Sequence, residues 1–247
     1  MLRQAATALL APIVLVVMTA GPHAGATQSL TGADLAGWRA DATELERLLV
    51  EEHCELARLI DPDAVRRAAA DLRERLPRMQ RHEALVGLFQ LGALPDDGHT
   101  GLDLREMLAG FGKYRFQGVL CADGYFVVGA PDEVAHLVGA RLVAVAGIPA
   151  DDVLDRLATI RGGENVHFKR LNTQGLLRFP EVLHALGVIA SPGAAEFTFE
   201  ASDGRRETVE FAPVTIEEYD EWARGREREP LWRPPIELAA DEPWGFG

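Results

Sequence analysis

Apolar residues in the first part of the chain recur at steps of three and four positions, the spacing of amphipathic helices. One such pattern covers about residues 33–57 and consists of Leu35, Trp38, Ala42, Leu45, Leu49 and Leu56. A second helix is predicted over about residues 62–76, because Asp61 stands as an N-cap before a proline. A third pattern over residues 85–91 must end by Pro95. Three antiparallel helices can bury these faces against one another.

After residue 112 the hydrophobic period changes from helical to strand-like. Residues 114–121 and 125–128 flank the turn sequence Ala122-Asp123-Gly124, which predicts a hairpin. A strand, two helices and a closing hairpin are then predicted at residues 142–145, 149–160, 179–186, and 196–201 with 207–211. These elements make a small mixed α/β module.

The complete pattern predicts the α+β fold class, with the chain divided into four segments. Residues 1–26 form a signal peptide, residues 27–112 a helical domain and residues 113–212 the mixed module. Residues 213–247 comprise a polar helix and a proline-rich tail. A further short helical piece is predicted at residues 104–108, within the helical domain. Aromatic residues among prolines expect a surface to pack on, so we interpret the tail, with Trp232, Trp244 and Phe246, as the stub of an absent domain.

The N-terminus has the composition of an export signal. Arg3 precedes an almost wholly apolar run at residues 8–20, and Ala24-Gly25-Ala26 supplies the small residues at which signal peptidase cuts. An uncleaved anchor is the alternative, but the run is shorter than the ~20 residues that a span requires, and it contains Pro12. We therefore predict cleavage after Ala26, export to the periplasm or medium, and no membrane span in the mature chain.

The net charge argues against nucleic acid as a partner, and the pairing of the two cysteines is a separate question. The chain has 25 Lys and Arg against 38 Asp and Glu, a net charge of −13, which repels nucleic acid. An exported protein can keep a disulfide, but the sequence does not decide whether Cys54 and Cys121 pair. Two buried free thiols are the favoured interpretation.

The order of several short motifs resembles a known protein family. Asp97-Gly98-His99-Thr100 follows the helical front, the hairpin contains residues 123–128, and residues 138–149 read VGARLVAVAGIP before a helix. This order is similar to the non-catalytic N-terminal part of carboxyl-terminal-processing, or tail-specific, serine peptidases. Residues 113–212 resemble the PDZ-like module of that family. The resemblance covers about residues 38–211, and it rests on the order of the motifs, none of which is specific alone.

The resemblance implies a protein without its own catalytic site. The family uses a serine nucleophile and a lysine general base in an α/β domain that follows the PDZ-like module, and this chain ends before such a domain. Only three serines are present, and Ser191 with Lys169 is the sole pair to consider. Because Lys169 precedes Ser191, against the family order, and no Gly-x-Ser-x-Gly occurs, we expect no catalytic residues here.

Other chemistry is assigned to local structure. Asp96, Asp97 and His99 are weighed as metal ligands or as an acid–base pair, but a turn that needs carboxylate acceptors and positive φ at Gly98 explains them better. The remaining histidines stand singly. We therefore expect no metal and no cofactor.

One loop is a candidate for peptide binding. A PDZ-like module receives a terminal carboxylate on the backbone donors of a glycine-rich loop, and Gly110-Phe111-Gly112-Lys113 precedes the first strand of the module. A hinge with Phe111 packed beneath it is the alternative. The resulting hypothesis is an exported, non-catalytic or truncated relative of a tail-specific peptidase that binds peptide or protein C-termini. A stand-alone extracytoplasmic scaffold, and a serine-type peptidase whose catalytic domain is supplied elsewhere, remain as alternatives; the oligomeric state is not predicted.

Overall fold

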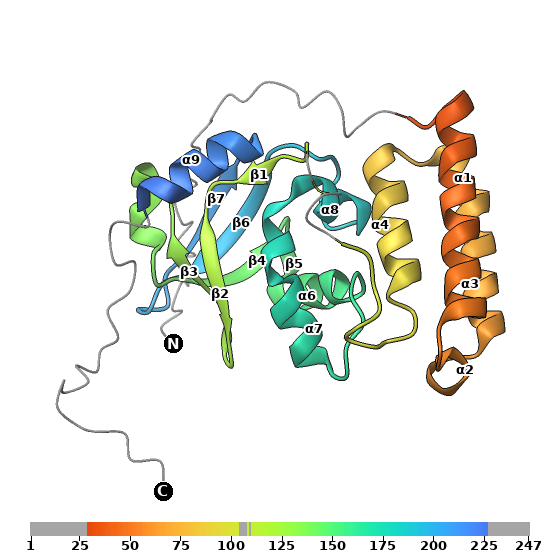
Figure 1. Cartoon of the computed structure of the whole chain (residues 1–247). Helices are drawn as coiled ribbons and strands as arrows, with labels where there is room; N and C mark the ends of the chain where they lie inside the picture. Colours follow the sequence, from red (N-terminus) through yellow and green to blue (C-terminus); the bar gives the residue numbers. More distant parts are fainter. Residues whose placement is uncertain (1–28, 104–107, 109, 227–247) are drawn as a thin grey trace, which may run out of the picture.

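The computed structural model describes residues 29–103, 108 and 110–226, and it confirms a helical part joined to a small antiparallel β module (Figure 1). The helical part contains α1 (Gly32–Arg47), the π-helical η1 (Leu48–Glu52), α2 (Leu56–Leu59), α3 (Pro62–Arg75), the 3-10 turn η2 (Leu76–Arg78) and α4 (Arg81–Gly92). The predicted signal peptide, all of the 104–108 piece except Leu108, and the tail after Arg226 lie outside the described residues.

The β module alternates strands with short helices. In chain order it contains β1 (Lys113–Tyr114), β2 (Gln117–Cys121), β3 (Gly124–Gly129), η3 (Asp132–Leu137), β4 (Arg141–Val145), β5 (Ile148–Pro149), α6 (Ala150–Ala158), α7 (Val166–Thr173), η4 (Gln174–Arg178), α8 (Pro180–Ala185), β6 (Ala195–Glu200), β7 (Arg206–Phe211), β8 (Pro213–Val214) and α9 (Ile216–Arg226). Within the described residues, no helix has the length and apolar character needed to cross a membrane.

Helices α1, α3 and α4 pack together as the apolar spacing predicts. The second helix begins where expected, because Asp61 accepts the backbone N–H of Asp63 and Pro62 occupies the first turn. The predicted helix over residues 33–57 is shorter: α1 widens into η1 and ends at His53, whose backbone is extended. His53 leaves the helix to place its Nε2 2.8 Å from the Thr100 hydroxyl, a contact far along the chain.

The main sheet is antiparallel, with strand order β2-β3-β4-β6-β7 and β5 paired to β4. Both predicted hairpins are confirmed, with Cys121 opposite Gly124 in one and Glu200 opposite Arg206 in the other. The single strand predicted over residues 114–121 is instead two strands. Tyr114 belongs to β1, which pairs with β8, whereas Gln117 begins β2 on the main sheet. Among the described residues, η4 and not another strand lies at the outer side of β2, and Tyr219 of α9 reaches Phe116 just before it.

Aromatic rings fill the centre of the β module. Phe197 of β6 is fully buried and contacts the rings of Tyr114, Phe116, Phe199 and Phe211. Helix α4 joins this core to that of the helical part, since Phe89 packs into the first and Leu88 into the second. The domain boundary at residue 112 therefore stays a prediction.

The N-termini of α7 and α9 both carry local capping signals, of which only that of α9 is used in the sequence prediction. Helix α7 is absent from the sequence prediction, although Asn165 caps it by accepting the Phe168 N–H. The polar helix predicted from Thr215 is α9, and its reciprocal capping box is present: the Thr215 N–H donates to Glu218, and the Glu218 N–H donates to the Thr215 hydroxyl.

Candidate functional site

The predicted loop 110–113 already holds a carboxylate from its own chain. The Gly112 N–H donates to both side-chain oxygens of Glu181, at 3.0 and 3.1 Å, and Glu181 is 1% exposed at the start of α8. Phe111 is buried, as the hinge interpretation expects, while Gly110 is exposed with φ at +88°. The Gly112 backbone donor therefore faces inward.

Lys113 lies directly beyond this loop in an aromatic setting. Its ammonium is 4.1 Å from the centre of the Tyr219 ring and 5.2 Å from that of Phe179. The Arg178 guanidinium lies over the same Tyr219 ring and donates to the Tyr219 hydroxyl. Burial lowers the pKa of Lys113, and the neighbouring charge of Arg178 lowers it further. Two cations thus share one ring.

The outer edge of β2 is bounded by side chains from later in the chain. The Leu120 N–H donates to Gln174 Oε1 at 2.6 Å, and the Tyr219 hydroxyl donates to the carbonyl of Phe116 at 3.5 Å. At Gly118, a Cβ would meet the buried Tyr125 ring at 2.2 Å, so this position requires glycine. In the part of the chain that the structure describes, single side chains and not a paired strand bound this edge.

A hollow of about 490 Å³ opens at the hairpin end of β2, between the β2–β3 turn, β4, the start of α6, and α7. Its lining includes three leucines and three arginines, namely Leu120, Leu142, Leu154, Arg141, Arg170 and Arg206. Arg141 and Arg206 both bind Glu200, and these hydrogen bonds lower the pKa of that carboxyl. The lining also includes Asp123, Asp151 and His167, so leucines and polar side chains together can receive the alternating side chains of an extended peptide segment.

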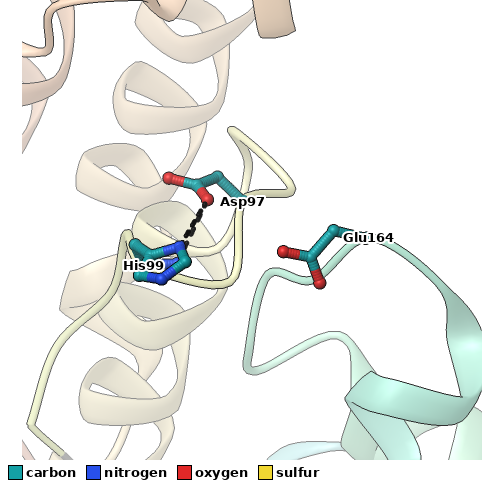
Figure 2. Close-up of side chains that lie close together, drawn as sticks. All are labelled: Asp97, His99 and Glu164. Atoms are coloured by element: carbon teal, nitrogen blue, oxygen red, sulfur yellow. Dashed lines mark hydrogen bonds and ion pairs between the residues drawn. The ribbon is translucent and has the colours of Figure 1, made fainter.

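A second cluster brings together Asp97, His99 and Glu164, as Figure 2 shows. One ligand atom from each lies within 4.8 Å of the others. Asp97 accepts the His99 N–H at 3.1 Å and the Thr100 hydroxyl at 2.8 Å, while its carboxylate is 3.5 Å from His99 Nδ1. The His99 side chain is 92% exposed. These residue types can hold a divalent cation or orient an imidazole.

The turn at this cluster corrects one expectation from the sequence. Asp96, with φ at +56°, adopts the left-handed conformation that was expected at Gly98. Gly98 is needed for space instead, because a Cβ there would lie 3.1 Å from Glu164 Oε1 and 3.3 Å from the Phe168 ring. No sequence signal links Glu164 to the turn, since the two loops are 65 or more positions apart and meet only through folding.

The accepted hydrogen bonds also make the turn sensitive to acid. The His99 N–H first, and the Thr100 hydroxyl second, hold the pKa of Asp97 below its usual value. A lowered folded-state pKa contributes stability that is present above the unfolded-state pKa. That contribution is lost as the pH falls through the folded-state value.

The serine and cysteine candidates lie as follows. Lys169 donates to Asp96 at 2.9 Å, whereas Ser191 is exposed in the loop between α8 and β6. The absence of a Ser-Lys pair stays a prediction. Cys54 and Cys121 are both free and both exposed, so the expectation that they are buried is wrong. Each ends up at the surface because it stands where an element ends, Cys54 after η1 and Cys121 at the β2 turn.

Comparison with known proteins gives distant matches only. No protein-family model matches the chain, and no curated protein does. Two solved structures are similar to it, that of mature CPAF complexed with lactacystin (19% identity, TM-score 0.48, 72% of this chain) and that of mature CPAF (20%, 0.46, 73%). CPAF is a chlamydial serine protease of the tail-specific-protease-like type. The chain spans about a third, 35%, of the length of either CPAF chain, and these matches do not define a family.

Proposed function

We propose that this chain is an exported, non-catalytic relative of tail-specific serine peptidases, and that it binds the C-terminal segment of a peptide or protein along β2. The observation that carries the proposal is the outer edge of β2, which is bounded by single side chains and leads into the hollow. A peptide that adds a strand there forms main-chain hydrogen bonds, and its alternate side chains enter the hollow. Export is supported by the apolar run at residues 8–20.

Gln174 makes this proposal testable without damage to the core. Its side chain holds the Leu120 N–H, which a bound peptide requires. Gln174→Ala should therefore tighten peptide binding about three- to tenfold, roughly 1 kcal/mol, because it releases that donor. Gln90→Ala is the matched control, since Gln90 donates to Thr159 away from β2 and should leave binding unchanged.

The measurement is fluorescence polarisation with three labelled decapeptides, in which serine alternates with valine, leucine or phenylalanine. We expect at least one to bind the full chain saturably, with Kd on the order of 10 μM, or roughly −7 kcal/mol. Binding that is weakened by Gln174→Ala, or no saturable binding by any of the three, would contradict strand addition at β2. A stand-alone extracytoplasmic scaffold would bind the same peptides. This experiment therefore tests peptide binding at β2, and it does not separate such a scaffold from a truncated peptidase relative.

A serine-type peptidase completed by another polypeptide is the second candidate, and the Asp97–His99 pair favours it. An exposed imidazole with a carboxylate at Nδ1 is the arrangement that lets histidine act as a general base. If this function is correct, hydrolysis of labelled casein should fall by about 100-fold or more in His99→Ala. His136→Ala is the control, because that histidine binds Glu207 elsewhere. Equal activities of the two variants, or no hydrolysis by the unchanged protein with or without its cell extract, would exclude the second candidate.

A further inference from the structure

Two half-buried cations, those of Lys113 and Arg178, lie over the Tyr219 ring, and the Asp220 carboxylate acts on Lys113 without forming a salt bridge with it. Within residues 29–103, 108 and 110–226, the structure gives neither Lys113 nor Arg178 an ion pair; Arg178 donates to the Gly175 carbonyl and the Tyr219 hydroxyl. Other partly buried cations do have such partners: Lys169 binds Asp96, and Arg170 binds Asp151 and Asp155. The lack of a salt bridge at either cation, within the part of the chain that the structure describes, stands out in a protein with 38 acidic and 25 basic residues.

We infer that Lys113 and Arg178 form an anion site that receives the terminal carboxylate of a bound peptide. This inference rests on the proposed function and adds the residues that recognise the peptide end. Burial and the neighbouring Arg178 both disfavour the charged form of Lys113, and Asp220 offsets this only in part, so the pKa of Lys113 is lowered. A carboxylate between the two cations supplies further negative charge and accepts charge-assisted hydrogen bonds.

The position of the pair matches the direction of an added strand. Tyr219 donates to the carbonyl of Phe116, the residue directly before β2, so the cations lie at the start of this strand. A peptide antiparallel to β2 has its C-terminus at that start. The five residues of β2 then carry it roughly 17 Å toward the hollow at the hairpin end.

The loop at residues 110–113, which the sequence predicted to bind the peptide carboxylate, does not offer its Gly112 N–H to a ligand, because that donor already has a partner. The Gly112 N–H binds Glu181, so a ligand carboxylate meets the side chains that follow the loop. The donors left for it are the Lys113 ammonium and the remaining Nη of Arg178. Asp220 acts on Lys113 with the opposite sign to Arg178, so the three side chains together carry one net positive charge, which a singly charged carboxylate balances.

The chain has only two lysines, which permits a direct test on the full protein. Limited reductive methylation followed by mass spectrometry measures the reactivity of Lys113, with Lys169 as an internal reference that is held by Asp96. We expect the Ser-Val decapeptide with a free carboxylate to slow methylation of Lys113 about fivefold or more, and to leave Lys169 unchanged. The amidated decapeptide and inorganic phosphate should leave both lysines unchanged.

Variants test the affinity. Lys113→Met and Arg178→Met keep the packing on Tyr219, and each should weaken binding of the free-acid decapeptide about tenfold while leaving the amide unchanged. Arg156→Met is the matched control, because Arg156 donates to the carbonyls of Leu186 and Gly187, which are not part of the proposed site.

The outcomes separate this inference from the proposed function. If no decapeptide binds but N-acetylvaline protects Lys113, strand addition fails and the carboxylate site stands. Equal binding of acid and amide, equal weakening of both by the two variants, or no protection of Lys113 by either N-acetylvaline or the decapeptide would overturn the inference. Protection by phosphate equal to that by N-acetylvaline would overturn its assignment to a carboxylate.

Discussion

Phe197→Ala should lower the free energy of unfolding by about 3–5 kcal/mol, the usual loss for a large aromatic residue deleted from a core. Phe197 is fully buried, and its ring centre lies 5.1 Å from that of Tyr114, 5.2 Å from Phe116 and 5.6 Å from Phe211. These rings come from β1, from Phe116 directly before β2, and from β7, so the cavity would loosen the elements that place the proposed peptide edge. Urea unfolding followed by circular dichroism measures the change.

Two further variants keep this prediction decisive. Phe197→Leu leaves most of the volume filled and should lose about 1–2 kcal/mol, which stays measurable if the alanine variant does not fold. Leu171→Ala is the control, because Leu171 is 54% exposed and should change stability by less than about 0.5 kcal/mol. A loss in Phe197→Ala as small as that in Leu171→Ala would mean that the aromatic cluster does not hold the module together.

Gly118→Ala is expected to have the second largest effect, about 1–3 kcal/mol of stability together with loss of peptide binding. The added Cβ would lie 2.2 Å from one carbon of the Tyr125 ring and 2.6 Å from its hydroxyl oxygen. Because Tyr125 is 1% exposed, its ring has no free space to move into, and β2 must shift away from β3. The displaced edge then no longer presents its N–H groups in register.

Gly37→Ala controls for the substitution itself. Gly37 lies within α1 with nothing within 4 Å of its Cβ position, so alanine should stabilise the protein by up to about 1 kcal/mol. The unfolding free energy and the decapeptide affinity are measured for both variants. If Gly118→Ala retained both values of the unchanged protein, the close contact with Tyr125 would not be what makes glycine necessary at this position.

Local signals account for the elements that were predicted correctly. Asp61 with Pro62, and Thr215 with Glu218, act within three residues of each other, so their capping needs no distant partner. The hairpin at Ala122-Asp123-Gly124 follows from turn chemistry in the same way, and so does the closing hairpin, whose strands are joined by the turn sequence Ser202-Asp203-Gly204. Asn165 carried an equally local signal for α7, which the missing apolar period concealed.

The errors occur where distant residues decide. The strand predicted over residues 114–121 divides because β8, about 100 positions later, pairs with Tyr114. The helix predicted to residue 57 ends early at His53, which reaches Thr100. In both cases the local pattern is compatible with the predicted element and with the observed one. The contact with a distant residue decides which of the two forms.

The sequence by itself determined the α+β class, the helix caps, the hairpin turns and the loop that carries Lys113. Only the tertiary structure decided which partners those residues meet. Gly112 binds Glu181, and Gln174 binds the edge of β2. Lys113 and Arg178 both lie over the Tyr219 ring. The physical reason is the separation along the chain between the residues that interact. Caps and turns are satisfied within a few residues, whereas partners that are 50 to 100 positions apart are chosen by how the helices and sheet pack together.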